Sequence, residues 1–198
     1  MKKLLFIDCC IRREASRTKK LADRFMEAVA KKGGYEIERL VLMDENLSYF
    51  SEGFFEQRQR MLDSKSLDAP RFRYARAFAQ ADKIVIAAPF WDLSFPALLK
   101  VYIENVSVES ITFGCDASGC FGICNAEEML YITTRGGDYS GDDEYLEQAG
   151  PYLESMCTFF GIDRFRMVAA DGLDLGLEPV EKILARAEKE LDEIAKEF

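Results

Sequence analysis

The sequence contains no histidine among its 198 residues. This absence excludes Ser-His-Asp and Cys-His catalysis, the helical zinc-protease motif and most histidine-bearing metal sites. Any enzymatic chemistry must therefore use carboxylates, thiols, hydroxyls or a bound cofactor. A redox cofactor fits this limit well, because the protein then supplies binding and orientation and needs no proton-transferring base.

Long apolar segments and an excess of positive charge are also absent. The apolar run 4–7 ends at Asp8, whereas the core of a signal peptide needs about 7–15 residues and a membrane span about 20. We therefore expect a cytoplasmic protein whose six cysteines are free thiols and not a disulfide framework. A net charge of -9 disfavours nucleic acid or an anionic membrane as a partner, because both require clustered lysine and arginine.

Length and composition are those of one domain. With 198 residues, 48% of them hydrophobic, the chain can bury a sizeable core. There is no internal repeat and no linker rich in proline, glycine or serine. We therefore expect residues 1–198 to form a single domain.

Short apolar runs alternate with longer helical stripes along the chain. The runs predict strands at 3–9, 36–42, 83–88, 129–134 and 164–169, the second nearer a sheet edge. Helices are predicted at 16–32, 96–106, 142–160 and 179–196, with one or two more within 51–80. Ser16 suits an N-cap and Gly33 a helix end, while Gly150-Pro151 predicts a kink or two helices. This alternation indicates an α/β fold with a parallel sheet covered by helices on both faces.

Ligands of such sheets bind at the carboxyl ends of the strands, so the loops after the first, third and fourth strands are the candidate site. The first loop runs into a helix with Ser16, Thr18 and three arginines, Arg12, Arg13 and Arg17. Hydroxyls, helical amides and the helix dipole favour an anion there. A simple N-cap with solvated basic residues explains the same pattern equally well. No Walker A or Gly-x-Gly-x-x-Gly motif is present.

The other two loops carry aromatics and glycines. Phe90 and Trp91 follow the third strand, where they could flank a planar ring or cap the core. Gly136-Gly137 follow the fourth strand and permit either a sharp turn or close approach of a flat ligand.

Taken together, the three loops resemble those of the FMN-dependent NAD(P)H:quinone oxidoreductases and azoreductases, a group with a flavodoxin-like fold. The resemblance is carried by the loop that begins at Ser16, by Ala88-Pro89-Phe90-Trp91-Asp92-Leu93-Ser94-Phe95-Pro96 and by Thr134-Arg135-Gly136-Gly137, in that order. It covers almost the whole chain and extends to Ala170-Asp171-Gly172-Leu173. The fold it implies is a flavodoxin-like three-layer sandwich around a five-stranded parallel sheet of order 2-1-3-4-5.

The resemblance also implies a cofactor, a reaction and a set of site residues. FMN is the cofactor, NADH or NADPH the electron donor, and a quinone or azo compound the small-molecule acceptor, in a ping-pong cycle. Family members are homodimers with the active site at the subunit interface. The chemistry is carried by the flavin, so no catalytic side chain and no metal ligand is implied. The implied contacts are Cys10, Ser16, Arg17 and Thr18 for the phosphate, Phe90, Trp91, Asp92 and Leu93 for the isoalloxazine ring, and Thr134, Arg135, Gly136 and Gly137 for its other edge.

Some residues depart from the family pattern. Asp92 stands where asparagine is usual, which could alter the flavin potential, and Cys9 and Cys10 replace serines. The segment 113–125 does not follow the azoreductase pattern, and we expect it to be a substrate lid near the flavin edge. Its cysteines, Cys115, Cys120 and Cys124, could be free thiols, a redox pair or, with Cys157, a metal site. We expect free thiols, because the spacing matches no zinc or ferredoxin motif.

Two other functions remain open at this point. A flavodoxin-type electron carrier would share the fold but lack its own nicotinamide site. A cofactor-free binding or sensor protein could also use this fold. The aromatics at the ends of the third and fourth strands, together with Phe54, Phe55, Phe159 and Phe160, exceed what one small core needs, which favours a two-fold homodimer with the flavin at its interface.

Overall fold

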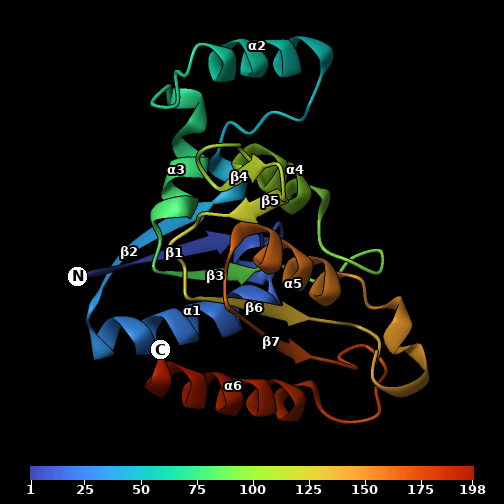
Figure 1. The fold of residues 1–198 in the computed structure, drawn as a ribbon. Helices are drawn as coiled ribbons and strands as arrows, with labels where there is room; N and C mark the ends of the chain where they lie inside the picture. The colour runs from blue at the N-terminus through green and yellow to red at the C-terminus, as the bar shows by residue number, and fades with distance from the viewer.

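A computed structural model describes residues 1–198 and contains a five-stranded parallel sheet in the order β2-β1-β3-β6-β7 (Figure 1). The strands are β1 (Lys2–Asp8), β2 (Tyr35–Val41), β3 (Lys83–Ala87), β6 (Glu128–Thr134) and β7 (Arg164–Ala170). Each begins and ends within one residue of its predicted bounds. When only the five strands of this sheet are numbered in chain order, β6 and β7 become the fourth and fifth, and the order is the predicted 2-1-3-4-5. Strand β2 lies at an edge, as expected.

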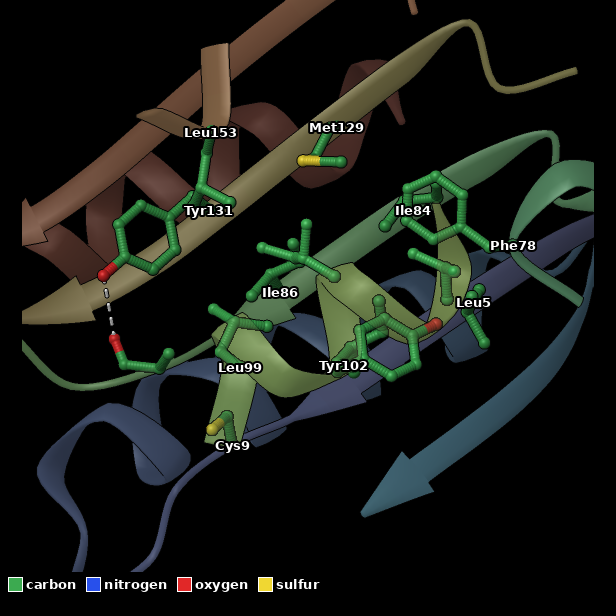
Figure 2. Packing of buried hydrophobic residues seen from close by; sticks show 14 of the residues in the cluster. Leu5, Cys9, Phe78, Ile84, Ile86, Leu99, Tyr102, Met129, Tyr131 and Leu153 are labelled. Carbon is green, nitrogen blue, oxygen red and sulfur yellow. Dashed lines mark hydrogen bonds between the residues drawn. The ribbon is translucent and has the colours of Figure 1, made fainter. Parts of the chain in front are cut away.

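Helices cover both faces of the sheet. Helices α1 (Arg17–Lys32) and α6 (Val180–Glu197) lie on one face, and α3 (Arg73–Gln80), α4 (Ala97–Val106) and α5 (Ala149–Phe160) lie on the other (Figure 1). Successive strand residues point to opposite faces, so Leu5 and Ile7 join the core under α3–α5, and Leu4 and Phe6 join the core under α1 and α6. Figure 2 shows the first core, where Tyr102 and Leu99 pack on the strands.

The charged segment 51–80 forms two helices, as predicted. Helix α2 (Glu52–Asp63) buries none of its residues and lies at the outer end of the molecule (Figure 1), followed by a 3₁₀ turn at Pro70–Phe72 and then α3. The segment 142–160 also divides in two, into a 3₁₀ helix at Gly141–Leu146 and α5. Pro151 stands in the first turn of α5, where a missing amide hydrogen removes no helical hydrogen bond. No helix is long and apolar enough to cross a membrane.

The segment 113–125 corrects two expectations. It forms a hairpin of β4 (Phe113–Asp116) and β5 (Gly119–Gly122), which places Cys115 opposite Cys120 and joins them in a disulfide. The prediction of six free thiols is therefore wrong for these two, while Cys9, Cys10, Cys124 and Cys157 are free. No group of three or more potential metal ligands is gathered anywhere in the chain.

The hairpin is also not where a lid over the flavin edge was expected. The backbone amide of Cys124 donates to the carbonyl of Phe160 at the last turn of α5, and that of Asn125 donates to Ala79 at the end of α3. Both contacts lie at the amino end of the strands. A segment that precedes a parallel strand reaches the sheet at that end, so within one chain the hairpin lies opposite the site loops.

Candidate functional site

The predicted loops meet at the carboxyl end of the sheet, around a cavity of about 120 Å³. Seven of the twelve predicted site residues line it: Ser16, Arg17, Phe90, Trp91, Thr134, Arg135 and Gly136. Its other lining residues are Arg12, Pro89, Leu173 and Asp174. Cys10, Thr18, Asp92, Leu93 and Gly137 are close in sequence but do not line the cavity.

The start of α1 forms the basic side of the cavity. Ser16 is buried, and its Oγ accepts a hydrogen bond of 3.2 Å from the backbone amide of Lys19, which confirms the predicted N-cap. The Arg17 guanidinium pairs with Asp174 at 2.8 Å, and Arg12 is exposed beside it. Amides of a first helical turn next to two arginines make this the part of the cavity best suited to an anion.

Cys10 and Thr18 are buried and do not line the cavity. The Cys10 amide donates to Asp8 Oδ1 at 2.9 Å, and its thiol faces Ala87 O at 3.6 Å inside the core. Burial, with the nearby Asp8 carboxylate, raises the pKa of the Cys10 thiol. Thr18 is fully buried, with its hydroxyl 2.7 Å from that of Thr134. Both residues therefore stabilise the loop after β1 through buried contacts.

The loop after β3 forms a tight turn that presents apolar side chains. Trp91 and Ser94 exchange two backbone hydrogen bonds of 2.9 and 2.8 Å, and the residues between them, Asp92 and Leu93, have φ of 48° and 65°. Positive φ is unusual for non-glycine residues and marks a constrained turn. Trp91 and Leu93 each remain 40% exposed, while the Asp92 side chain lies in solvent.

The loop after β6 contacts the loop after β7 through backbone hydrogen bonds. A Cβ on Gly136 would lie 2.6 Å from Asp174 Oδ2, so a larger residue here would require the Asp174 side chain to move. The amides of Leu173, Asp174 and Gly172 donate to the carbonyls of Arg135, Gly136 and Gly137 at 2.8–3.1 Å. The Gly-Gly pair is thus one side of a backbone ladder.

Sequence reasoning missed Leu173 and Asp174 as site residues. Their place in the sequence could have indicated this role, because they follow the fifth strand, which ends at the same edge of the sheet as the other four. It also missed Glu147, whose buried carboxylate stands beside Arg135. No local pattern marks that contact.

The strand order and the loop-built cavity at the carboxyl edge define the class of flavodoxin-like α/β proteins, and the family described as flavodoxin-like fold matches residues 2–195. Over 201 aligned residues that span both proteins completely, the chain is 39% identical to FMN-dependent NADH:quinone oxidoreductase 2 of Clostridium acetobutylicum. The chain therefore belongs to the family of the FMN-dependent NADH:quinone oxidoreductases.

Solved structures agree with this assignment. An azoreductase from Bacillus anthracis str. Sterne is 26% identical and superposes with a TM-score of 0.90 over all of both chains. An FMN-dependent NADH-azoreductase from Bacillus anthracis str. Ames Ancestor, solved in complex with FMN, is 25% identical with a TM-score of 0.88, covering 100% of this chain and 99% of that one. The fold and family predicted from the three loops are confirmed.

Proposed function

We propose that this protein is an FMN-dependent oxidoreductase that passes electrons from NADH or NADPH to a small acceptor such as a quinone or an azo compound. The observation that carries this proposal is the full-length 39% identity to an FMN-dependent NADH:quinone oxidoreductase. The loops that carried the sequence resemblance also converge on one cavity. A flavodoxin-type carrier and a cofactor-free sensor are not favoured, because the relatives are named as enzymes.

The residues of the cavity fit FMN. An anion such as its phosphate suits the first turn of α1, next to Ser16, Arg12 and Arg17. The Asp174 carboxylate lies against Gly136, so a flat group placed there would require the Asp174 side chain to move. The ring would lie between the loop of Phe90, Trp91, Asp92 and Leu93 and the loop of Thr134, Arg135, Gly136 and Gly137. Cys10 and Thr18 support the phosphate loop from the core side instead of contacting the ligand with their side chains.

The size of the cavity bears on assembly. A flavin ring needs more than about 120 Å³, so we expect it to extend over the exposed Trp91 and Leu93. Exposed apolar side chains at a site are commonly covered by a ligand or a partner. We propose a homodimer in which the second subunit closes the site. Light scattering of the purified protein should give twice the chain mass, whereas a fully active monomer would contradict it.

The protein contributes position and electrostatics. FMN bound at this site would supply the redox chemistry between a nicotinamide and an acceptor. The amides at the start of α1 and the Arg17 guanidinium hold the phosphate end. The turn at Asp92-Leu93 and the ladder between the loops after β6 and β7 hold the ring end in place. The exposed side chains of Trp91 and Leu93 would exclude water from one side of a bound ring.

A reconstitution experiment tests the proposal. Purified protein mixed with FMN should bind it with visible flavin absorbance and then oxidise NADH or NADPH when a quinone or azo dye is present. Running both nucleotides against a quinone panel also identifies the preferred donor. Protein that binds no FMN, or that binds it but is not reduced by either nucleotide, would contradict the proposal. The cytoplasmic location, and the expectation that neither nucleic acid nor membrane is a partner, stay predictions.

A further inference from the structure

Arg135 is a buried cation at the base of the candidate site. Its side chain is only 4% exposed, although it is the first residue after β6 and lines the cavity. Its amide donates to Ala170 O at 2.9 Å and its carbonyl accepts from Leu173 at 3.1 Å, so its backbone is fixed to the end of β7. A guanidinium removed from water requires charged or polar partners.

Those partners come from different elements. Glu147 Oε1 lies 3.5 Å from Arg135 Nη2, and Asp171 Oδ1 lies 3.4 Å from Nε. The sulfur of Met167 lies 3.1 Å from Nη2. Burial raises the pKa of the Asp171 carboxyl, and Arg135 opposes that shift. The guanidinium therefore joins the junction before α5 to the loop after β7.

Glu147 is also fixed on its other side. Its side chain is 7% exposed, and it accepts hydrogen bonds of 2.8–3.1 Å from the amides of Ala149 and Gly150 in the first turn of α5. A Cβ on residue 150 would lie 2.7 Å from Glu147 Oε2, so glycine at this position makes room for the carboxylate. Glu147 thereby connects the start of α5 to Arg135.

The same cation contacts the loop after β3. The guanidinium carbon of Arg135 lies 5.2 Å from the centre of the Phe90 ring, which itself packs on Tyr139 at 4.6 Å. Arg135 Nε and Asp171 Oδ1 are buried and make no hydrogen bond. A buried network with incomplete hydrogen bonding contributes little to stability. Its distinctive property is geometric, because it links both loops proposed to hold the flavin ring.

We propose that Glu147, acting through Arg135, is a positioning residue that holds the loops after β3 and β6 in the arrangement that binds the flavin ring. Asp171 lies beside Nε of the same guanidinium. This inference rests on the proposed function and extends it, because it separates two halves of the site. The half at α1 binds the phosphate, and the half organised by Glu147 binds the ring.

Riboflavin and FMN distinguish the two halves, because riboflavin has the ring but no phosphate. The experiment titrates each into the full-length apoprotein and follows the quenching of flavin fluorescence. Glu147→Gln should weaken the binding of both by the same factor, about tenfold or more. Glu154→Gln, at an exposed glutamate on α5, is the matched control and should change neither.

Two results would overturn the proposal: affinity in Glu147→Gln within a factor of two of wild type, or a loss confined to FMN. Hydrogen exchange of the apoprotein gives a readout without flavin. Amides in 90–94 and 135–137 should exchange faster in Glu147→Gln while those of β1 do not, and uniform acceleration would indicate a role in overall stability alone. If Glu147→Gln does not fold, Asp171→Asn is tested by the same criteria. Wild-type protein that binds neither flavin would refute the proposed function itself.

Discussion

The hydroxyls of Thr18 and Thr134 lie 2.7 Å apart and connect helix α1 directly to the carboxyl end of β6. Thr18 is fully buried, so this contact is made below the surface of the candidate site. It joins the loop proposed for the phosphate to the loop proposed for the ring. This hydroxyl pair is therefore one direct link between the two halves, and the Arg17–Asp174 ion pair is another.

We expect Thr18→Val, which keeps the side-chain shape, to lower the free energy of unfolding by about 1–2 kcal/mol, because Thr134 then lacks its partner. Thr134→Val should have a similar effect, and the double variant should cost less than the sum of the two. Urea unfolding of the four proteins measures this coupling. Strictly additive effects would show that the hydroxyl pair contributes nothing.

The two serine N-caps of the chain allow a matched test of the phosphate half. Ser16 caps α1 at the cavity, and Ser51 caps α2 far from it, accepting from the Phe54 amide at 3.4 Å. Replacing either with alanine should destabilise the protein by about 1 kcal/mol or less. Only Ser16→Ala should reduce FMN affinity, by about tenfold, and it should leave riboflavin binding unchanged. Unchanged FMN affinity would place the phosphate elsewhere.

The turn after β3 is expected to be conformationally costly. Leu93 has φ of 65°, a region that costs a residue with a Cβ about 1–2 kcal/mol. Leu93→Gly should raise the melting temperature by a few degrees while weakening riboflavin binding, because the exposed apolar side chain is lost. Leu177→Gly, at an exposed position without positive φ, is the control. A lower melting temperature for Leu93→Gly would contradict the expectation.

At the amino edge of the sheet, Glu128 is 2% exposed and is paired with Lys83 at 2.7 Å and with Arg166. Burial is the largest single influence and opposes its ionisation, but the hydrogen bonds and charges of Arg166 and Lys83 together outweigh it and lower the pKa of Glu128 from its ordinary value. The stabilisation that ionised Glu128 gives to the folded state is therefore fully present above the unfolded-state pKa and is lost as the pH falls through the folded-state pKa. In Glu128→Gln, the free energy of unfolding should depend less on pH below about 5. If the free energy of unfolding of Glu128→Gln depends on pH below about 5 as strongly as that of the wild type, other carboxylates dominate this dependence.

The disulfide predicts a definite thiol count. Protein purified without reductant and alkylated after denaturation should have four modified cysteines, and six after treatment with a dithiol. Cys115→Ser with Cys120→Ser should lower stability by at most about 2 kcal/mol, because the closed loop is short. Its FMN affinity should match wild type, since the hairpin lies at the opposite end of the sheet within the chain. Six modified cysteines before reduction would contradict the pairing.

Much of the fold was predictable because it depends on local patterns. Continuous apolar runs such as 83–88 mark buried parallel strands, and the caps at Ser16 and Gly33 depend on residues next to them. The site loops could be found because they follow those strands. The hairpin was not predictable in the same way, because cysteine connectivity does not follow from spacing.

The Arg135 network lay beyond sequence reasoning for a similar reason. Glu147 is twelve residues after Arg135 in an acidic stretch that is most simply interpreted as a solvated helix start. Its burial depends on how α5 docks, which no local pattern specifies. Likewise, the glycine at 136 predicted close backbone approach correctly, but the neighbour that approaches it is Asp174.

The hairpin is attached to the domain by backbone packing at its base. A Cβ on Gly122 would lie 1.9 Å from the Gly161 nitrogen, and Cys124 donates to Phe160 O. None of residues 115–121 belongs to the hydrophobic core. Residues of the tip other than Cys115 and Cys120 can therefore change with little effect on folding, provided that both glycines and the disulfide remain. This surface can thus be re-engineered independently of the flavin site, for instance to carry a label or a graft.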